Sequence, residues 1–230
     1  MKRLLRYLLK IRFELFFITQ MAVLFGSLFF EAHFYIEFIY PFLFLLNLMA
    51  GMVIISVRKH HFWISVMFFF VALAFTEVNP FIAPHWEVGV NVAEIIFYFG
   101  FYGFVTVRII QQVWKSREVT SNVVFGLMSG YIALGLMAFF IFFFIETLFP
   151  GSFKGLAIEG ADQLQKINSL LYYSFITLMT IGYGEIFPLT VKAQKAAMLV
   201  GLVGQFYLVI ITAVVIEKYI RTRHLTHDDQ

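Results

Sequence analysis

The chain has 230 residues, with 17 Lys and Arg against 14 Asp and Glu, and a formal net charge of +3. Its hydrophobic fraction of 61%, its 31 Phe and its charged fraction of 13% lie far from the composition of soluble domains. This composition excludes an ordinary soluble protein, and the absence of Cys excludes disulfides and thiolate metal sites.

Residues 1–11 are expected to form an amphipathic cytoplasmic helix. Lys2, Arg3, Arg6 and Lys10 fall on one side of a helical wheel, and leucines fall largely on the other. Such a helix lies at the membrane surface with its basic side toward anionic headgroups. A signal peptide is the alternative, but the apolar run extends to Phe30 and contains no clear small-residue cleavage pattern.

Six apolar segments are long enough to cross a bilayer, which takes about 20 residues of helix. They lie at residues 12–30, 35–57, 62–81, 88–113, 123–149 and 191–220. Residues 170–184 are too short to cross and end in glycines, which predicts a re-entrant segment before the last span. The expected fold is therefore an all-α membrane protein with six transmembrane helices. Residues 12–113 form a four-helix domain, 114–122 a cytoplasmic linker, 123–220 a pore domain and 221–230 a short cytoplasmic tail.

The positions of Lys and Arg predict the orientation of these spans. All but four of the 17 basic residues fall on the side of the N-terminus, and the exceptions are Lys154, Lys166, Lys192 and Lys195. Because basic residues concentrate in cytoplasmic loops, both termini are expected in the cytoplasm. The re-entrant segment then opens to the outside of the cell membrane.

The re-entrant segment consists of an expected helix at residues 170–179 and a loop at residues 180–184, which reads Thr180-Ile181-Gly182-Tyr183-Gly184. A dehydrated K⁺ needs rings of oxygen ligands in place of water, and four chains can supply these from backbone carbonyls. Gly182 and Gly184 tolerate the left-handed dihedral angles that such a row of carbonyls requires. Thr180 can add a hydroxyl oxygen at the inner end.

This loop resembles the selectivity filter of the potassium channels that have six spans and one pore loop. The resemblance includes Tyr172, Tyr173 and Thr177 before the loop and Pro188 and Thr190 after it. Gly204 lies at the spacing of a hinge glycine. Two residues depart from the pattern, because Met179 replaces a threonine and Glu185 replaces an aspartate.

The resemblance implies a homotetramer in the lipid bilayer, with K⁺ as the permeant ion and with neither a cofactor nor a nucleic-acid partner. It places K⁺ at Thr180, Ile181, Gly182 and Tyr183, and Gly184 completes the filter. Residues with a supporting role are then Tyr172, Tyr173, Thr177, Glu185 and Glu146. Glu146 is expected to hydrogen-bond the outer pore loop, with an ordinary exposed carboxylate as the alternative.

The fourth span lacks the charges of a voltage sensor, which needs several per subunit for steep gating. Steps of three residues back from Arg108 reach Val105, Tyr102, Phe99 and Ile96, none of which is charged. We therefore expect a voltage-sensor-like domain that does not sense voltage. Arg108 is interpreted as an interfacial anchor, with a sensor remnant as the alternative.

Gating is less well defined by the sequence. Gly201 and Gly204 remove side chains at two neighbouring positions of the inner helix, which favours either a hinge or close helix packing. Glu14, inside the first span, is either functional or paired near the cytoplasmic interface. Four of the six histidines form a short loop pair, His60-His61, and part of a solvated tail, His224 and His227, and neither place is expected to be a metal site.

The sequence as a whole predicts a channel for passive, potassium-selective conduction rather than an enzyme. No acid, base and nucleophile gather in the sequence. A weakly selective cation channel is an alternative because of Met179 and Glu185. A nonconducting scaffold or a transporter is another, although transporters usually show paired broken helices and this chain has a single glycine-rich interruption.

Overall fold

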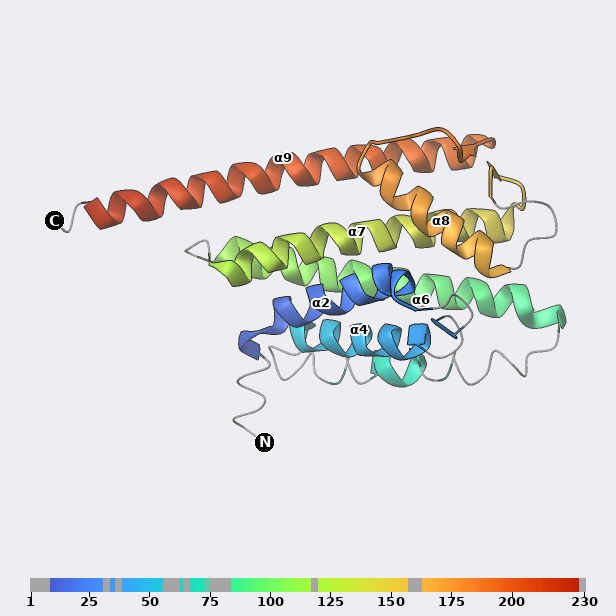
Figure 1. Ribbon diagram of the computed structural model, residues 1–230, viewed down its shortest axis with the longest axis horizontal. Coiled ribbons are helices and arrows are strands. Elements are labelled where there is room, and N and C mark those ends of the chain that lie inside the picture. Colours follow the sequence, from blue (N-terminus) through green and yellow to red (C-terminus); the bar gives the residue numbers. More distant parts are fainter. Residues whose placement is uncertain are drawn as a thin grey trace. The chain divides into compact units, whose positions relative to one another are not determined.

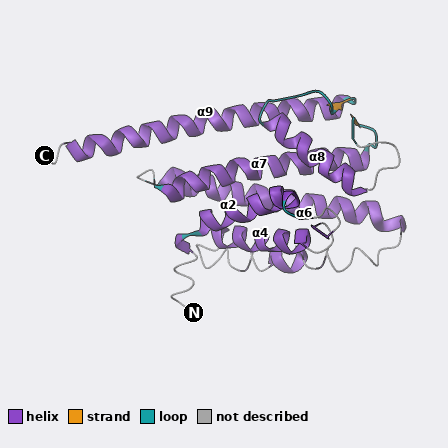
Figure 2. Cartoon of the chain, in the orientation of Figure 1, coloured by secondary structure: helices purple, strands orange, loops and turns teal. Residues whose placement is uncertain are grey.

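The computed structural model describes residues 9–30, 34–35, 39–55, 63, 67–72, 74, 84–116, 120–156 and 163–227. The described chain is almost entirely helical, with two short strands (Figure 2). The helices are α2 (Arg12–Phe25), the 3-10 helix η1 (Gly26–Leu28), α4 (Tyr40–Ile55), α6 (Pro84–Lys115), α7 (Ser121–Leu148), α8 (Gln163–Leu178) and α9 (Val191–His227), and the strands are β1 (Phe153–Lys154) and β2 (Phe187–Pro188).

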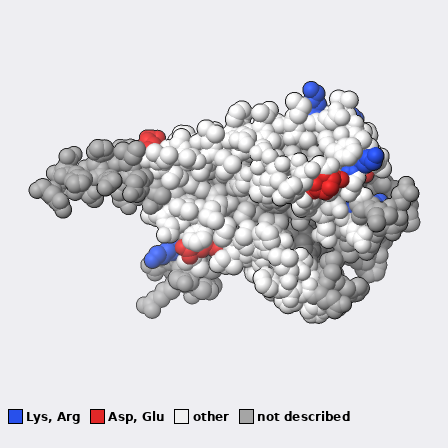
Figure 3. Space-filling model, turned by 45° about the horizontal axis from the view of Figure 1, so that its top comes forward, with Lys and Arg blue, Asp and Glu red and all other residues white. Residues whose placement is uncertain are grey.

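Three of the described helices are long and apolar enough to cross a membrane, and they contain Val88–Lys115, Ser121–Leu148 and Val191–Glu217. These segments coincide with the expected fourth, fifth and sixth spans. Few charged side chains are visible among the described residues on the face drawn in Figure 3. The helical content and these apolar lengths support an all-α membrane protein. The N-terminal helix expected at 1–11 and the span expected at 62–81 lie mostly outside the described residues.

The first helix is shorter than the span expected from hydropathy. α2 ends at Phe25 instead of Phe30, and the chain continues into the 3-10 turn that begins at Gly26. The Tyr35 hydroxyl donates a 2.8 Å hydrogen bond to the Val23 carbonyl, and a Cβ at Gly26 would lie 2.5 Å from the Tyr35 ring. α4 extends from Tyr40 to Ile55 within the expected span 35–57, of which residues 36–38 and 56–57 lie outside the described residues.

The chain divides into two compact units. The first contains Met1–Pro80, Phe104–Ile132 and Arg221–Gln230, and the second contains Phe81–Gly103 and Ala133–Ile220. This division passes through α6 and α7, and each of these long helices contributes one end to each unit. The domain boundary expected in the linker at residues 114–122 stays a prediction.

Buried polar side chains link the helices of the first unit. Asn47 Nδ2 of α4 donates a 2.9 Å hydrogen bond to Thr19 Oγ1 of α2, and Gln20 Nε2 donates one of 3.2 Å to the Ser129 carbonyl of α7. The Ser129 hydroxyl donates one of 3.3 Å to the Phe13 carbonyl. Such bonds between helices bring polar groups together inside an otherwise apolar bundle.

Aromatic packing forms the core of the second unit. The Phe142 ring of α7 contacts Tyr173 of α8 at 4.9 Å and Phe153 of β1 at 5.4 Å between ring centroids. Tyr98 of α6 stacks on Phe140 of α7 at 5.7 Å. Tilted and offset ring pairs at such distances stabilise a core beyond their buried area. This core fixes α8, which runs obliquely beside α7 and α9 (Figure 1).

The last two helices extend beyond their expected ends. α8 begins at Gln163 and not at residue 170. The expected start at residue 170 was too late because the first two turns of α8 are rich in polar residues and do not continue the apolar run. α9 continues beyond residue 220 to His227, through much of the expected tail. Residues 205–227 contain neither Gly nor Pro, so nothing local ends the helix earlier.

Candidate ion-conducting site

The loop at residues 180–184 is attached to the C-terminal end of α8 by backbone hydrogen bonds. The amide of Thr180 donates to the Thr177 carbonyl at 3.0 Å, and the amide of Ile181 donates to the Ile176 carbonyl at 2.9 Å. These carbonyls belong to the last turn of α8, where helical partners are missing. The helix end therefore fixes the direction in which the loop leaves.

Backbone handedness alternates along the loop. Thr180, Gly182 and Gly184 have φ values of 57°, 57° and 92°, whereas Ile181 and Tyr183 have no positive φ. In a regular strand, successive residues point to opposite sides. A left-handed residue at every second position reverses that alternation and brings successive carbonyls toward one side. The loop thus has the alternating left-handed φ values that a row of carbonyl oxygens on one side requires.

All five residues of this loop are exposed in the single chain. The side chain of Ile181 is 46% exposed and that of Tyr183 is 73% exposed. One chain provides one row of carbonyl oxygens, and a dehydrated ion needs oxygens on all sides. The arrangement is suited to a site that several chains share.

Tyr172 and Glu185 connect α8 to the outer end of the loop. Their side chains form a hydrogen bond, which is the main reason that the pKa of Tyr172 is raised to about 12. Desolvation and the negative charge of Glu185 add to this increase in pKa. The longer arm of Glu185, compared with aspartate, reaches the phenol.

Tyr173 is buried in the aromatic core, whereas Tyr172 is exposed. Burial raises the pKa of Tyr173, and a hydrogen bond with the Thr177 side chain acts in the opposite direction. The structure therefore places these four residues in two separate pairs, Tyr172 with Glu185 and Tyr173 with Thr177.

The Glu146 carboxylate, near the end of α7, binds the loop that follows the helix. It accepts hydrogen bonds from the amides of Gly151 at 2.8 Å and Ser152 at 3.0 Å. Ser152 in turn accepts a 2.8 Å bond from the amide of Leu189 through its carbonyl. Its hydroxyl accepts a 3.2 Å bond from Thr190. This chain of contacts connects α7 to the segment that leaves the filter loop.

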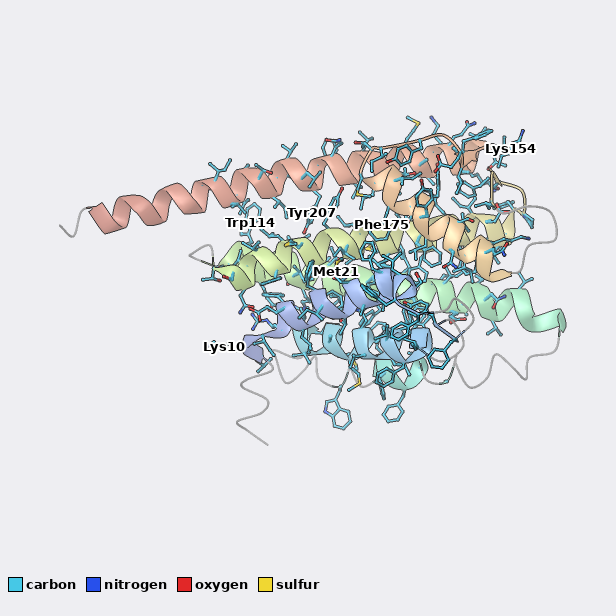
Figure 4. All side chains as sticks on the ribbon, viewed as in Figure 1. Lys10, Met21, Trp114, Lys154, Phe175 and Tyr207 are labelled. Atoms are coloured by element: carbon cyan, nitrogen blue, oxygen red, sulfur yellow. The ribbon has the colours of Figure 1, made fainter. Side chains whose placement is uncertain are left out.

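A two-residue antiparallel pairing completes the outer loop. Phe153 pairs with Pro188, and Lys154, which is labelled in Figure 4, pairs with Phe187. Gly155 follows with a φ of 86°, and a Cβ there would collide with the Glu185 carbonyl oxygen. Ser152 and Gly155 were not predicted from the sequence. Three glycines between the fifth span and the helix expected at residues 170–179, at positions 151, 155 and 160, were the available signal for Gly155.

α9 packs directly against the C-terminal end of α8. A Cβ at Gly204 would collide with the Leu178 carbonyl oxygen, and one at Gly201 would lie 3.9 Å from the Thr177 carbonyl oxygen. α9 is helical through both glycines. Of the two alternatives left open by the sequence, the structure displays close packing at Gly204.

One further residue at this site was not predicted. Gln205 Nε2 of α9 donates a 3.1 Å hydrogen bond to Thr180 Oγ1. The signal was a lone carboxamide between residues 196 and 211 of an otherwise apolar span. Polar residues inside spans are functional candidates because their burial in lipid is costly.

Other candidate residues do not join this site. Arg108 donates a 3.1 Å hydrogen bond to Gln111 Oε1 on its own helix and lies 5.1 Å from the Phe104 ring centroid. Within the described residues, no three His, Asp or Glu lie close enough to hold a metal ion. A groove of about 200 Å³ in the second unit is lined by apolar side chains alone, namely Ile95, Ile96, Phe99, Phe140, Ile141 and Phe144.

Comparison with known proteins is consistent with this geometry. Residues 131–221 match the family model described as "Ion channel". The match includes most of α7, all of α8, the filter loop and most of α9, and it supports an ion channel function for this part of the chain. No curated protein and no solved structure matches the chain.

Proposed function

We propose that the protein is a potassium-selective channel in which four identical chains surround one pore. Each chain contributes the second half of α7, α8, the filter loop and α9. Thr180, Ile181, Gly182 and Tyr183 line the ion path with oxygens, and Gly184 completes the loop. Conduction is passive, and K⁺ moves down its electrochemical gradient along these oxygens.

The observation that carries this proposal is the alternating handedness at Thr180, Gly182 and Gly184. It occurs in a loop that the end of α8 holds between two helices long enough to cross a membrane. Backbone carbonyls directed to one side can replace the hydration shell of K⁺ when four copies meet. The ion channel match over residues 131–221 supports the same conclusion.

Assembly into a tetramer is supported by the exposure of the loop and of α9. In the most apolar 18-residue stretch of Val191–Glu217, only 17% is buried within the single chain, compared with 56% in the corresponding stretch of Ser121–Leu148. Of the three described helices that are long enough to cross a membrane, α9 therefore has the smallest buried share, which leaves much of its length available to neighbouring chains and lipid. Native mass measurement of the purified protein is expected to give four chains, and a monomer or dimer would contradict the shared pore.

The channel is proposed to have six spans, to lie in the cell membrane with both termini in the cytoplasm, and to open independently of voltage. Residues 95–107 of α6 carry no charge. Transfer of one charge through the membrane field contributes about 2.3 kcal/mol per 100 mV, so several charges are needed for steep gating. A flat relation between open probability and voltage is expected, and a steep one would contradict this part of the proposal.

Ion selectivity is tested by reconstitution in bilayers with unequal K⁺ and Na⁺. The reversal potential is expected to follow the K⁺ gradient by about 59 mV per tenfold change for a univalent ion. A current whose reversal potential does not change with the K⁺ gradient indicates the weakly selective cation channel instead. Absence of any current indicates the nonconducting scaffold or a transporter.

A matched pair of glycine variants connects the selectivity to the loop. Gly182→Ala places a side chain at a φ of 57° and is expected to abolish selective current. Gly100→Ala adds the same methyl group to α6, where a Cβ meets nothing within 4 Å, and is expected to retain it. Equal currents from both variants would show that the loop backbone does not form the filter.

A further inference from the structure

A single side-chain contact connects the inner helix to the innermost residue of the filter loop. Gln205 Nε2 lies 3.1 Å from Thr180 Oγ1, although the two residues are 25 positions apart. Both residues are exposed in the single chain. The contact therefore lies at a surface, where four chains would enclose it, and not inside the core.

The backbone next to Gln205 is held close to α8. The preceding residue, Gly204, has no room for a Cβ because the Leu178 carbonyl oxygen lies against it. This close approach sets the distance between α9 and the residues just before Thr180. A small movement of α9 at this point must alter the Gln205–Thr180 contact, since no flexible segment separates Gly204 from Gln205.

Thr180 needs such support because its backbone is strained. It is the only non-glycine with a positive φ in the described part of the chain, at 57°. A β-branched residue in the left-handed region is unfavourable and persists only where its surroundings hold it. Two contacts hold Thr180, namely the 3.0 Å bond from its amide to the Thr177 carbonyl and the bond from Gln205 to its hydroxyl.

The chemistry of the two groups gives this contact a function. A threonine hydroxyl oxygen has two lone pairs, so it can accept from an amide with one and face a cation with the other. We propose that Gln205 is a positioning residue for the innermost ion site, and that it holds the Thr180 hydroxyl oxygen toward the permeant ion. Ion occupancy at that site then depends on the position of α9.

This inference rests on the proposed function, since it concerns the inner end of the same filter. Ba²⁺ applied from the cytoplasmic side is a suitable probe. It has nearly the ionic radius of K⁺ with twice the charge, so its block reports the quality of an oxygen ring. Loss of one hydrogen bond per chain is expected to weaken the block roughly tenfold.

The experiment compares Ba²⁺ block in four reconstituted channels: wild type, Gln205→Met, Thr180→Val and the double variant. Gln205→Met retains the length of the side chain and removes the amide. We expect both single variants to weaken the block and the double variant to be no weaker than Thr180→Val, because Gln205 acts through the Thr180 hydroxyl. Additive effects of the two substitutions, or no effect of Gln205→Met, would overturn the inference.

Two further variants separate positioning from a general effect on α9. Gln205→Glu retains the length and a hydrogen-bonding partner for the hydroxyl, so its Ba²⁺ block is expected to be at least as strong as that of wild type. Thr212→Val removes a hydroxyl that donates 2.7 Å to Leu208 on the same helix, and it is expected to leave the block unchanged. Weakened block in either variant would contradict a specific function of the Gln205–Thr180 pair.

The same measurements distinguish this inference from the proposed function. A wild-type channel without K⁺ selectivity refutes the proposed function itself. A selective wild type with unaltered block in Gln205→Met refutes only the positioning by Gln205. If Gln205→Met does not assemble, Gln205→Asn provides the test, because its amide is one methylene too short to reach Thr180 and the same weakening is expected.

Discussion

The Glu146 carboxylate accepts a 3.0 Å hydrogen bond from the backbone amide of Ser152, six residues further along the chain. Ser152 then binds the segment that leaves the filter loop through the amide of Leu189. The C-terminal end of α7 and the segment that follows the loop at residues 180–184 are thus linked through two hydrogen bonds. A charged acceptor at this position stabilises the outer loop more than a neutral one.

The substitution Glu146→Gln should therefore destabilise the outer loop. It retains the size of the side chain and removes the charge that strengthens both backbone bonds, which corresponds to roughly 1–2 kcal/mol. Thermal unfolding of the purified protein in detergent should show a lower midpoint. Glu217→Gln, an exposed carboxylate in α9, is the matched control, and an equal decrease in both variants would argue against the Glu146–Ser152 contact as the cause.

Two glycines of the outer loop differ only in the space around them. Gly151 and Gly155 have φ values of 82° and 86°, but a Cβ at Gly151 meets nothing within 4 Å, whereas one at Gly155 collides with the Glu185 carbonyl oxygen. Gly151→Ala should cost about 1 kcal/mol of stability from backbone strain alone. Gly155→Ala should cost clearly more and should also impair conduction.

Unfolding midpoints and K⁺ currents of the two alanine variants provide the measurement. A similar loss of stability in both would mean that the close approach of Gly155 to Glu185 contributes nothing. Retention of normal current in Gly155→Ala would contradict the connection between the outer loop and the filter.

Sequence reasoning recovered the elements whose signal is local. The apolar runs predicted α6, α7 and α9 to within a few residues at most ends, because hydropathy and length suffice for a spanning helix. The loop at Thr180–Gly184 was predicted from its glycine spacing, which is also a local property, and left-handed φ values do occur at Thr180, Gly182 and Gly184. The early start of α8 at Gln163 was missed because its first turns are polar, and Gln165, Lys166 and Asn168 are exposed, so apolarity is not required there.

The contacts that organise the site could not be predicted in this way. Gln205 and Thr180 are 25 residues apart, and Ser152 and Thr190 are 38 apart. Which polar groups meet depends on how α9 and the outer loop pack, and no periodicity encodes that packing. The end of α2 at Phe25 has a similar origin, because Tyr35 folds back onto Gly26 only in the tertiary structure.

The phenol of Tyr172 should ionise at unusually high pH. Its pKa is raised to about 12 from 10, chiefly by the hydrogen bond with Glu185. A raised pKa means that folding favours the protonated phenol, so this contribution to stability is complete below pH 10 and is lost as the pH rises through about 12. Alkaline destabilisation in this range should therefore be smaller in Tyr172→Phe.

Ultraviolet titration of tyrosinate checks this prediction. The difference between wild type and Tyr172→Phe should show one group that titrates near pH 12, and Glu185→Gln should move that group toward 10. A difference titration centred at 10 in the wild type would show that the two side chains do not interact in the folded protein.

The packing of α8 on α7 depends on a glycine beneath an aromatic ring. A Cβ at Gly135 of α7 would collide with the Phe175 ring, which Figure 4 labels on α8. Gly135→Ala should overpack this contact at a cost of about 1–3 kcal/mol and should shift the helix that carries the filter loop. Adding Phe175→Leu, which shortens the opposing side chain, should restore part of the lost stability and current. Gly100→Ala controls for the helical preference of alanine, and failure of the double variant to recover would show that the two residues do not act as a packed pair.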